Sequence, residues 1–171
     1  MIARAGAPMS PLIWLGAPTV AVLAASLVLA TPVRIAGLQA PEPVFALVPA
    51  FAWAMARPSV LPPFMLVLLG LGLDLLWGAP LGLWPTCLLA AFALVFAARR
   101  ILSGQEFWGL WAWYAAACAV AMTVGLLLVA LRAGRFPSLI GTGAQFGVTL
   151  LLFPFAWRLI ERYEASDTRY R

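Results

Sequence analysis

The sequence predicts an all-α membrane protein, a multi-pass helix bundle that forms a single integral membrane domain over residues 1–171. Of these residues, 64% are hydrophobic and only 10% are charged, and the mean hydropathy is +0.99. Soluble domains carry roughly 25% charged residues and roughly 45–50% apolar ones, so a soluble surface cannot be built from this composition. The apolar runs alternate with short stretches rich in arginine, glycine and proline, and this spacing predicts six transmembrane segments.

The predicted segments follow one another closely along the chain. They are residues 12–30, 44–56, 59–77, 80–98, 108–131 and 139–157, followed by a charged tail at 158–171. The first apolar run is longer than the roughly 7–15 residues of a signal-peptide core, so we expect a retained helix rather than a cleaved leader. The proline-rich interval 31–43 predicts an irregular loop.

The segment 44–56 is the shortest of the six. As a helix it would cover about 20 Å at 1.5 Å per residue, which is short for a hydrocarbon core of about 30 Å. Pro49 lies inside it and would kink it. The segment is therefore either a short broken span or a re-entrant piece, and the second alternative leaves five spans.

All the basic residues are arginines, and they lie at the ends of the predicted segments. With six spans and the N-terminus inside, one side holds Arg4, Arg57, Arg99, Arg100, Arg158, Arg162, Arg169 and Arg171. The other side holds Arg34, Arg132 and Arg135. The positive-inside rule then predicts a cytoplasmic C-terminus, but Arg4 and Arg34 exchange sides in the five-span alternative, so the rule cannot choose between them.

The residue types exclude several kinds of site. Histidine is absent and only two cysteines occur, Cys87 and Cys118, so neither a Cys/His zinc site nor a Ser-His-Asp triad is expected. Both cysteines fall inside apolar segments and are expected to pack as small hydrophobic residues. We expect no cofactor. The net charge of +5 is interpreted as lipid-headgroup anchoring rather than nucleic-acid binding, because the arginines flank the spans.

Asp74 is the one acid within the apolar part of the predicted bundle, near the junction of 59–77 and 80–98. It follows Arg57 by about 25 Å of helix, which predicts a place near the outer interface. Its carboxylate could accept N–H bonds in the turn at 77–79 and favour the dipole of the next helix, with Pro80 at that helix's first position. The alternative is a contact with a partner or substrate, since a lone acid beside lipid is costly.

Small residues recur at four-residue intervals in the last two predicted spans. The rows are Ala115 and Ala119; Ala117, Ala121 and Gly125; and Gly143 and Gly147. Such rows let helices approach closely, and we expect packing within the bundle, with contact to another membrane protein as the alternative. Thr142 and Gln145 are expected to form hydrogen bonds between helices.

Together, these features resemble a known family, the bacterial rod shape-determining protein MreD. The resemblance rests on Arg57-Pro58, on Asp74-x-x-x-Gly78-x-Pro80-x-Gly82 and on Arg99-Arg100. It covers roughly residues 10 to 160 and is most specific in about 25 residues around Asp74.

The resemblance implies a non-enzymatic multi-pass protein of the bacterial inner membrane that works in the cell-elongation complex. Its partners would be MreC, MreB and the glycosyltransferase and transpeptidase that build lateral-wall peptidoglycan, and it would bind no nucleic acid. The bundle would be similar to the six-helix substrate-binding subunits of vitamin uptake transporters. A second hypothesis is a substrate-binding or transport subunit of a small-molecule uptake system, which the scarcity of convergent polar groups disfavours.

Overall fold

The computed structural model describes residues 11–29, 34–35, 38–39, 42–55, 59–134 and 138–168. These residues form seven helices and one short hairpin. The elements are α1 (Pro11–Leu29), β1 (Arg34–Ile35), β2 (Leu38–Gln39), α2 (Leu47–Met55), α3 (Leu61–Trp77), α4 (Leu83–Leu102), α5 (Phe107–Ala133), α6 (Leu139–Leu150) and α7 (Phe153–Thr168). The helical fold class is confirmed.

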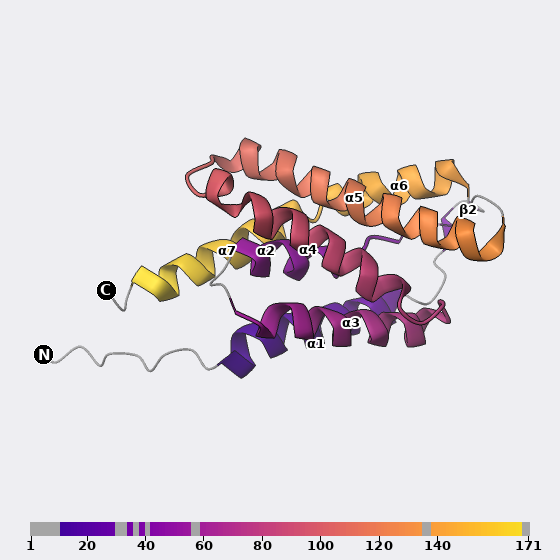
Figure 1. Ribbon diagram of the computed structural model, residues 1–171, viewed down its shortest axis with the longest axis horizontal. Coiled ribbons are helices and arrows are strands. Elements are labelled where there is room, and N and C mark those ends of the chain that lie inside the picture. The colour runs from indigo at the N-terminus through magenta and orange to yellow at the C-terminus, as the bar shows by residue number, and fades with distance from the viewer. Residues whose placement is uncertain are drawn as a thin grey trace, which may run out of the picture.

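The helices form a bundle with α2 and α4 at its centre. Figure 1 shows α1 and α3 side by side along one edge and α5 and α6 along the opposite edge. Helix α7 packs on α2, and α4 packs on α2, α3 and α5. In place of the irregular loop predicted at 31–43, β1 and β2 pair antiparallel, with Arg34 opposite Gln39.

Three helical stretches are long and apolar enough to cross a membrane. They are Leu83–Leu102, Phe107–Arg132 and Leu139–Glu161, while Leu15–Val28 and Leu61–Trp77 are shorter apolar helices. The chain therefore has the character of a multi-pass membrane protein. By length and composition, however, the described helices support about three spans and not the predicted six.

Helix α2 explains part of the difference. It has 9 residues, so at 1.5 Å per residue it is about 14 Å long and cannot cross a hydrocarbon core of about 30 Å. Every residue from Leu47 to Ala54 except Val48 is buried. The kink predicted at Pro49 is wrong, because Pro49 lies in the first turn of α2, where a helix needs no N–H donor.

The last predicted span, 139–157, is not one helix but two. Helix α6 ends at Leu150, residues 151–152 form a turn, and α7 begins at Phe153. Pro154 explains the break, because its ring would clash with the Leu150 carbonyl in a continuous helix. Helix α7 then continues to Thr168, into the segment predicted as a charged tail.

Aromatic rings tie the centre of the bundle together. The Phe51 ring of α2 lies 5.4 Å from the Tyr114 ring of α5 and 6.4 Å from the Phe153 ring of α7, measured between centroids. All three side chains are fully buried. Edge-to-face pairs of this kind add about 0.5–1.5 kcal/mol each beyond the burial of their area. The short α2 is thus held in the core by the long α5 and by α7.

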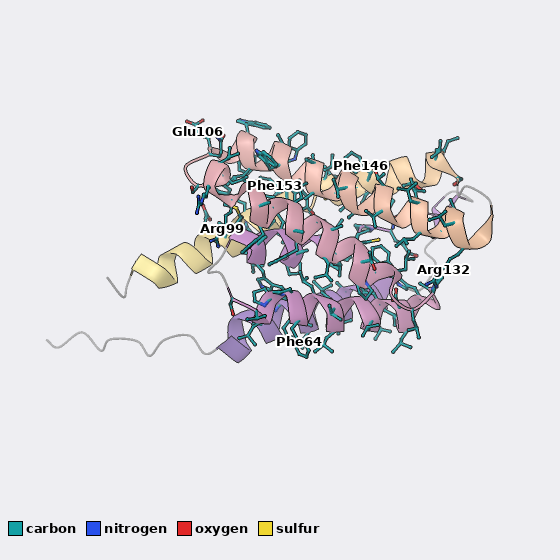
Figure 2. All side chains as sticks on the ribbon, viewed as in Figure 1. Phe64, Arg99, Glu106, Arg132, Phe146 and Phe153 are labelled. Carbon is teal, nitrogen blue, oxygen red and sulfur yellow. The ribbon has the colours of Figure 1, made fainter. Side chains whose placement is uncertain are left out.

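Charged side chains mark the two ends of the bundle. Figure 2 shows Arg99 and Glu106 at one end and Arg132 at the other. Arg99 lies in the last turn of α4, where its guanidinium sits 4.6 Å from the centre of the Phe96 ring. The connection between α3 and α4, seen in Figure 1, lies at the end of the bundle where Figure 2 labels Arg132. Asp74 belongs to this connection.

Candidate functional site

Asp74 lies in the last turn of α3 and is only 1% exposed. Its carboxylate accepts two backbone hydrogen bonds from the start of the next helix. Oδ2 accepts from the Gly82 N–H at 2.7 Å, and Oδ1 accepts from the Trp84 N–H at 3.0 Å. The carboxylate therefore caps the N-terminus of α4, where the helix dipole also favours negative charge.

The first turn of α4 uses this acid because its own N-cap residue, Gly82, has no side chain. The Leu83 N–H donates to the Pro80 carbonyl at 3.1 Å, and the Thr86 N–H donates to the Gly82 carbonyl at 3.3 Å. Pro85 has no N–H to satisfy. With the two bonds to Asp74, every amide from Gly82 to Thr86 has a partner, which removes the cost of burying free donors.

The glycines of the motif shape the chain reversal that brings α4 back to Asp74. Gly78 follows α3 with φ 61° and Gly82 precedes α4 with φ 93°, both in the left-handed region. The Gly78 N–H donates to the Asp74 carbonyl and so ends α3, and the Ala79 N–H donates to the same oxygen at 2.9 Å. A side chain at either position would strain the backbone, so the sequence uses glycine.

The carboxylate lies at the N-terminus of α4, as expected for an acid that favours the dipole of the next helix, but two other parts of the prediction are wrong. The amides of the 77–79 turn donate to the backbone carbonyl of Asp74 and not to its carboxylate. Pro80 is not the first residue of the helix, because the left-handed Gly82 delays its start to Leu83. Arg57 and Pro58, which were also predicted as possible partner contacts, lie outside the described residues.

Two features beside Asp74 were not found from the sequence. The rings of Trp77 and Trp84 pack edge to face with centroids 5.0 Å apart, and the Trp77 indole N–H is buried with no partner in the described part of the chain. The second feature is a close contact between α3 and α4 at Gly70, where a Cβ would lie 2.5 Å from the Pro85 nitrogen. In the sequence, the only indication of this contact is that Gly70 precedes Asp74 by about one helical turn.

The small-residue rows have different environments. Ala117 and Ala121 are buried, and a Cβ on Gly125 would lie 3.3 Å from the Cys87 Sγ, so this row packs against α4 as predicted. The prediction is wrong for α6. Gly143 and Gly147 are exposed, and nothing lies within 4 Å of a Cβ at either one. Their row points away from the bundle, because α6 packs mainly on α5 through another face.

Thr149, and not Thr142 or Gln145, links helices by hydrogen bonds. Its Oγ1 accepts from the Val44 N–H at 3.1 Å, and its carbonyl accepts from the Tyr114 hydroxyl at 3.3 Å. Thr142 donates only to the Ser138 carbonyl one turn earlier in the chain. The Gln145 carboxamide has no hydrogen-bond partner among the described residues. The break after α6 exposes the Thr149 carbonyl to Tyr114, which makes this link possible.

The described residues hold no group of three Cys, Asp or Glu side chains arranged to bind a metal ion. In comparisons with known proteins, no family model, no curated protein and no solved structure matches this chain significantly.

Proposed function

We propose that this chain is a non-enzymatic membrane component of a bacterial cell-elongation complex, of the MreD type. It would organise or regulate lateral-wall peptidoglycan synthesis together with MreC, MreB and the wall synthases. The observation that carries the proposal is the outward row of Gly143 and Gly147 on α6, an uncovered helix face suited to a partner's transmembrane helix. Helices in lipid associate through such small residues because their backbones can approach closely.

The Asp74 turn supports a structural role over a catalytic one. Both carboxylate oxygens already accept backbone N–H bonds, so the acid serves the helix connection. The outer side of this end of the bundle carries Leu75, 75% exposed, and Leu81, 63% exposed. A rigid turn with apolar side chains on its outside suits a second contact with a membrane partner.

We further propose an inner-membrane protein with a cytoplasmic C-terminus, and of the two predicted topologies we propose the five-span alternative, in which the segment at 44–56 is re-entrant. The burial and shortness of α2 support the five-span alternative. Arg99 and Arg132 lie at opposite ends of the bundle (Figure 2), which supports the proposal that these two arginines lie on opposite sides of the membrane. A reporter enzyme fused after residue 171 would be active only in the compartment that holds the C-terminus.

A cavity between α2, α4, α5 and α6 favours the alternative, a substrate-binding or transport subunit. Its volume is about 180 Å³, and Thr142 and Gln145 are among its lining residues. Pockets for small solutes usually measure about 300–1,000 Å³ and contain several convergent polar groups. The cavity is therefore small and poor in polar groups for a specific solute, and the scaffold remains the better proposal.

Depletion of the protein distinguishes the two functions. If rods become round while solute uptake is unchanged, the scaffold is supported. Normal cell shape with the loss of one nutrient's uptake would support the transport subunit and contradict the scaffold.

Co-purification tests the α6 surface directly. The double variant Gly143→Leu with Gly147→Leu should lose MreC or the wall synthases from detergent-solubilised complexes, because the added side chains keep a partner helix away. Ala116→Leu, at an exposed position of α5, is the matched control and should keep them. Equal recovery of partners with both proteins would exclude the α6 face as the docking surface.

A further inference from the structure

The cavity between α2, α4, α5 and α6 has a closed apolar floor and a partly exposed rim. The floor includes Val44, Leu47, Cys87 and Ala121, all buried. The rim includes Val129, Thr142 and Gln145, which are partly exposed. Three of the four helices around it belong to the stretches long enough to cross a membrane. Its opening therefore lies in the part of the protein expected to meet lipid.

The size and chemistry of the cavity select its occupant. The cavity has a volume of about 180 Å³ and is open on one side, so a molecule from the surroundings can enter it. Water needs two to four polar partners, and the buried floor residues Val44, Leu47 and Ala121 offer no polar side chain, so water is disfavoured at the floor but not at the rim. An apolar cavity of roughly 150 Å³ is enough for a benzene-sized hydrocarbon. A segment of a hydrocarbon chain fits the same kind of space.

Polar and charged side chains lie between the cavity and one end of the bundle. Met122, Gly125 and Val129 line it from one face of α5, at helical spacing, and Arg132 comes one turn after Val129 on that face. Arg132 is exposed at the end of the bundle (Figure 2). Thr142 lies in the first turn of α6, and Gln145 brings a carboxamide with no protein partner among the described residues.

We infer that this cavity binds one acyl chain of a bilayer phospholipid. The chain lies on the floor beside Cys87, the ester group lies near Thr142 and Gln145, and the phosphate pairs with the Arg132 guanidinium. A neutral hydrogen-bonding rim and a cationic end match an acyl chain, its ester and its phosphate in the order in which a phospholipid presents them. This site is independent of the proposed scaffold function.

Photolabelling of the intact protein tests the site. The protein is reconstituted in nanodiscs of phosphatidylethanolamine and phosphatidylglycerol, with a phosphatidylglycerol that carries a photoactivatable diazirine in one acyl chain. Labelled peptides are mapped by mass spectrometry. We expect label at Cys87 and Leu126 as well as at the lipid-facing Leu131, which is 81% exposed. Label at Leu131 without label at Cys87 and Leu126 would overturn the inference.

Paired variants separate the cavity from the surrounding lipid. Val129→Trp fills the rim and should abolish label at Cys87. Leu127→Trp, at a position on α5 that is 52% exposed and does not line the cavity, should leave it intact. Label at Leu131 in both proteins reports that each is folded in the bilayer. Undiminished label at Cys87 in Val129→Trp would show that the label does not come through the cavity.

Two further measurements test the headgroup and the absence of water. Arg132→Gln should lower label at Cys87, whereas Arg100→Gln, near the other end of the bundle, should not. Equal label in the two would refute the phosphate assignment. A charged thiosulfonate reagent should not reach Cys87 in the reconstituted protein. Rapid modification of this thiol would mean a water-filled cavity, which would contradict lipid occupancy and favour the solute-binding function.

Discussion

Replacement of Asp74 by alanine should destabilise the bundle more than the loss of any other single carboxylate in the described part of the chain. The carboxylate accepts from Gly82 at 2.7 Å and from Trp84 at 3.0 Å while only 1% exposed. Hydrogen bonds to charged groups contribute about 1.5–3 kcal/mol each, and buried donors left unpaired cost about 1–3 kcal/mol each. The two estimates describe the same loss, so we expect roughly 3–6 kcal/mol for Asp74→Ala.

Asp74→Asn gives an intermediate test of the same geometry. The carboxamide oxygen can still accept one N–H, but its NH₂ group faces the second N–H as another donor. About half of the alanine effect should therefore remain, roughly 1.5–3 kcal/mol. The stability should therefore fall from wild type to Asp74→Asn to Asp74→Ala, because the side chain offers two hydrogen-bond acceptors, then one, then none.

Glu106→Ala is the matched control. Glu106 is also an acid at the N-cap of a long helix, but it is exposed and makes no capping hydrogen bond with its side chain. Its replacement should change stability by less than about 0.5 kcal/mol, as is usual for surface substitutions. The free energies are measured by reversible unfolding in mixed micelles with increasing SDS. Equal midpoints for Asp74→Ala and Glu106→Ala would refute the capping argument.

Two other substitutions test the packing and the hydrogen bonds of the bundle. Gly70→Ala should lower the free energy of unfolding by about 1–3 kcal/mol, because its Cβ would lie 2.5 Å from the Pro85 nitrogen and push α3 away from α4. The control is Gly143→Ala, whose Cβ meets nothing within 4 Å. Equal thermal midpoints for the two variants would show that α3 and α4 are not in close contact. Thr149→Val should cost about 1–3 kcal/mol because the buried Val44 N–H loses its acceptor, and unchanged hydrogen-exchange protection at Val44 would contradict that role.

Hydropathy and residue spacing predicted the helices well where local chemistry decides the outcome. The segments predicted at 59–77 and 108–131 correspond to α3 and α5 within two residues at each end. The glycine and proline spacing after Asp74 correctly predicted a shaped turn between two helices. These features depend on residues adjacent in the chain, so the sequence contains the necessary information.

The burial of α2 and the break before α7 were harder to predict. The segment 44–56 is as apolar as a membrane span, and composition alone cannot distinguish a lipid-facing helix from one surrounded by other helices. Pro154 did offer a local sign, since a proline at that position would disrupt one continuous helix. Thr149 was not recognised, because its partners Val44 and Tyr114 come from distant segments.

The sequence by itself determined that the chain is a helical membrane protein and that Asp74 needs hydrogen-bond donors, because burial of an unpaired carboxylate is too costly. Only the tertiary structure decided which donors these are. The reversal through Gly78 and Gly82 carries α4 back beside α3, so amides eight and ten residues away reach the carboxylate. The same packing decided that Gly125 faces α4 while Gly143 and Gly147 face outward. Identical spacing in sequence gave different surroundings, because neighbouring helices cover one face of each helix and leave another uncovered.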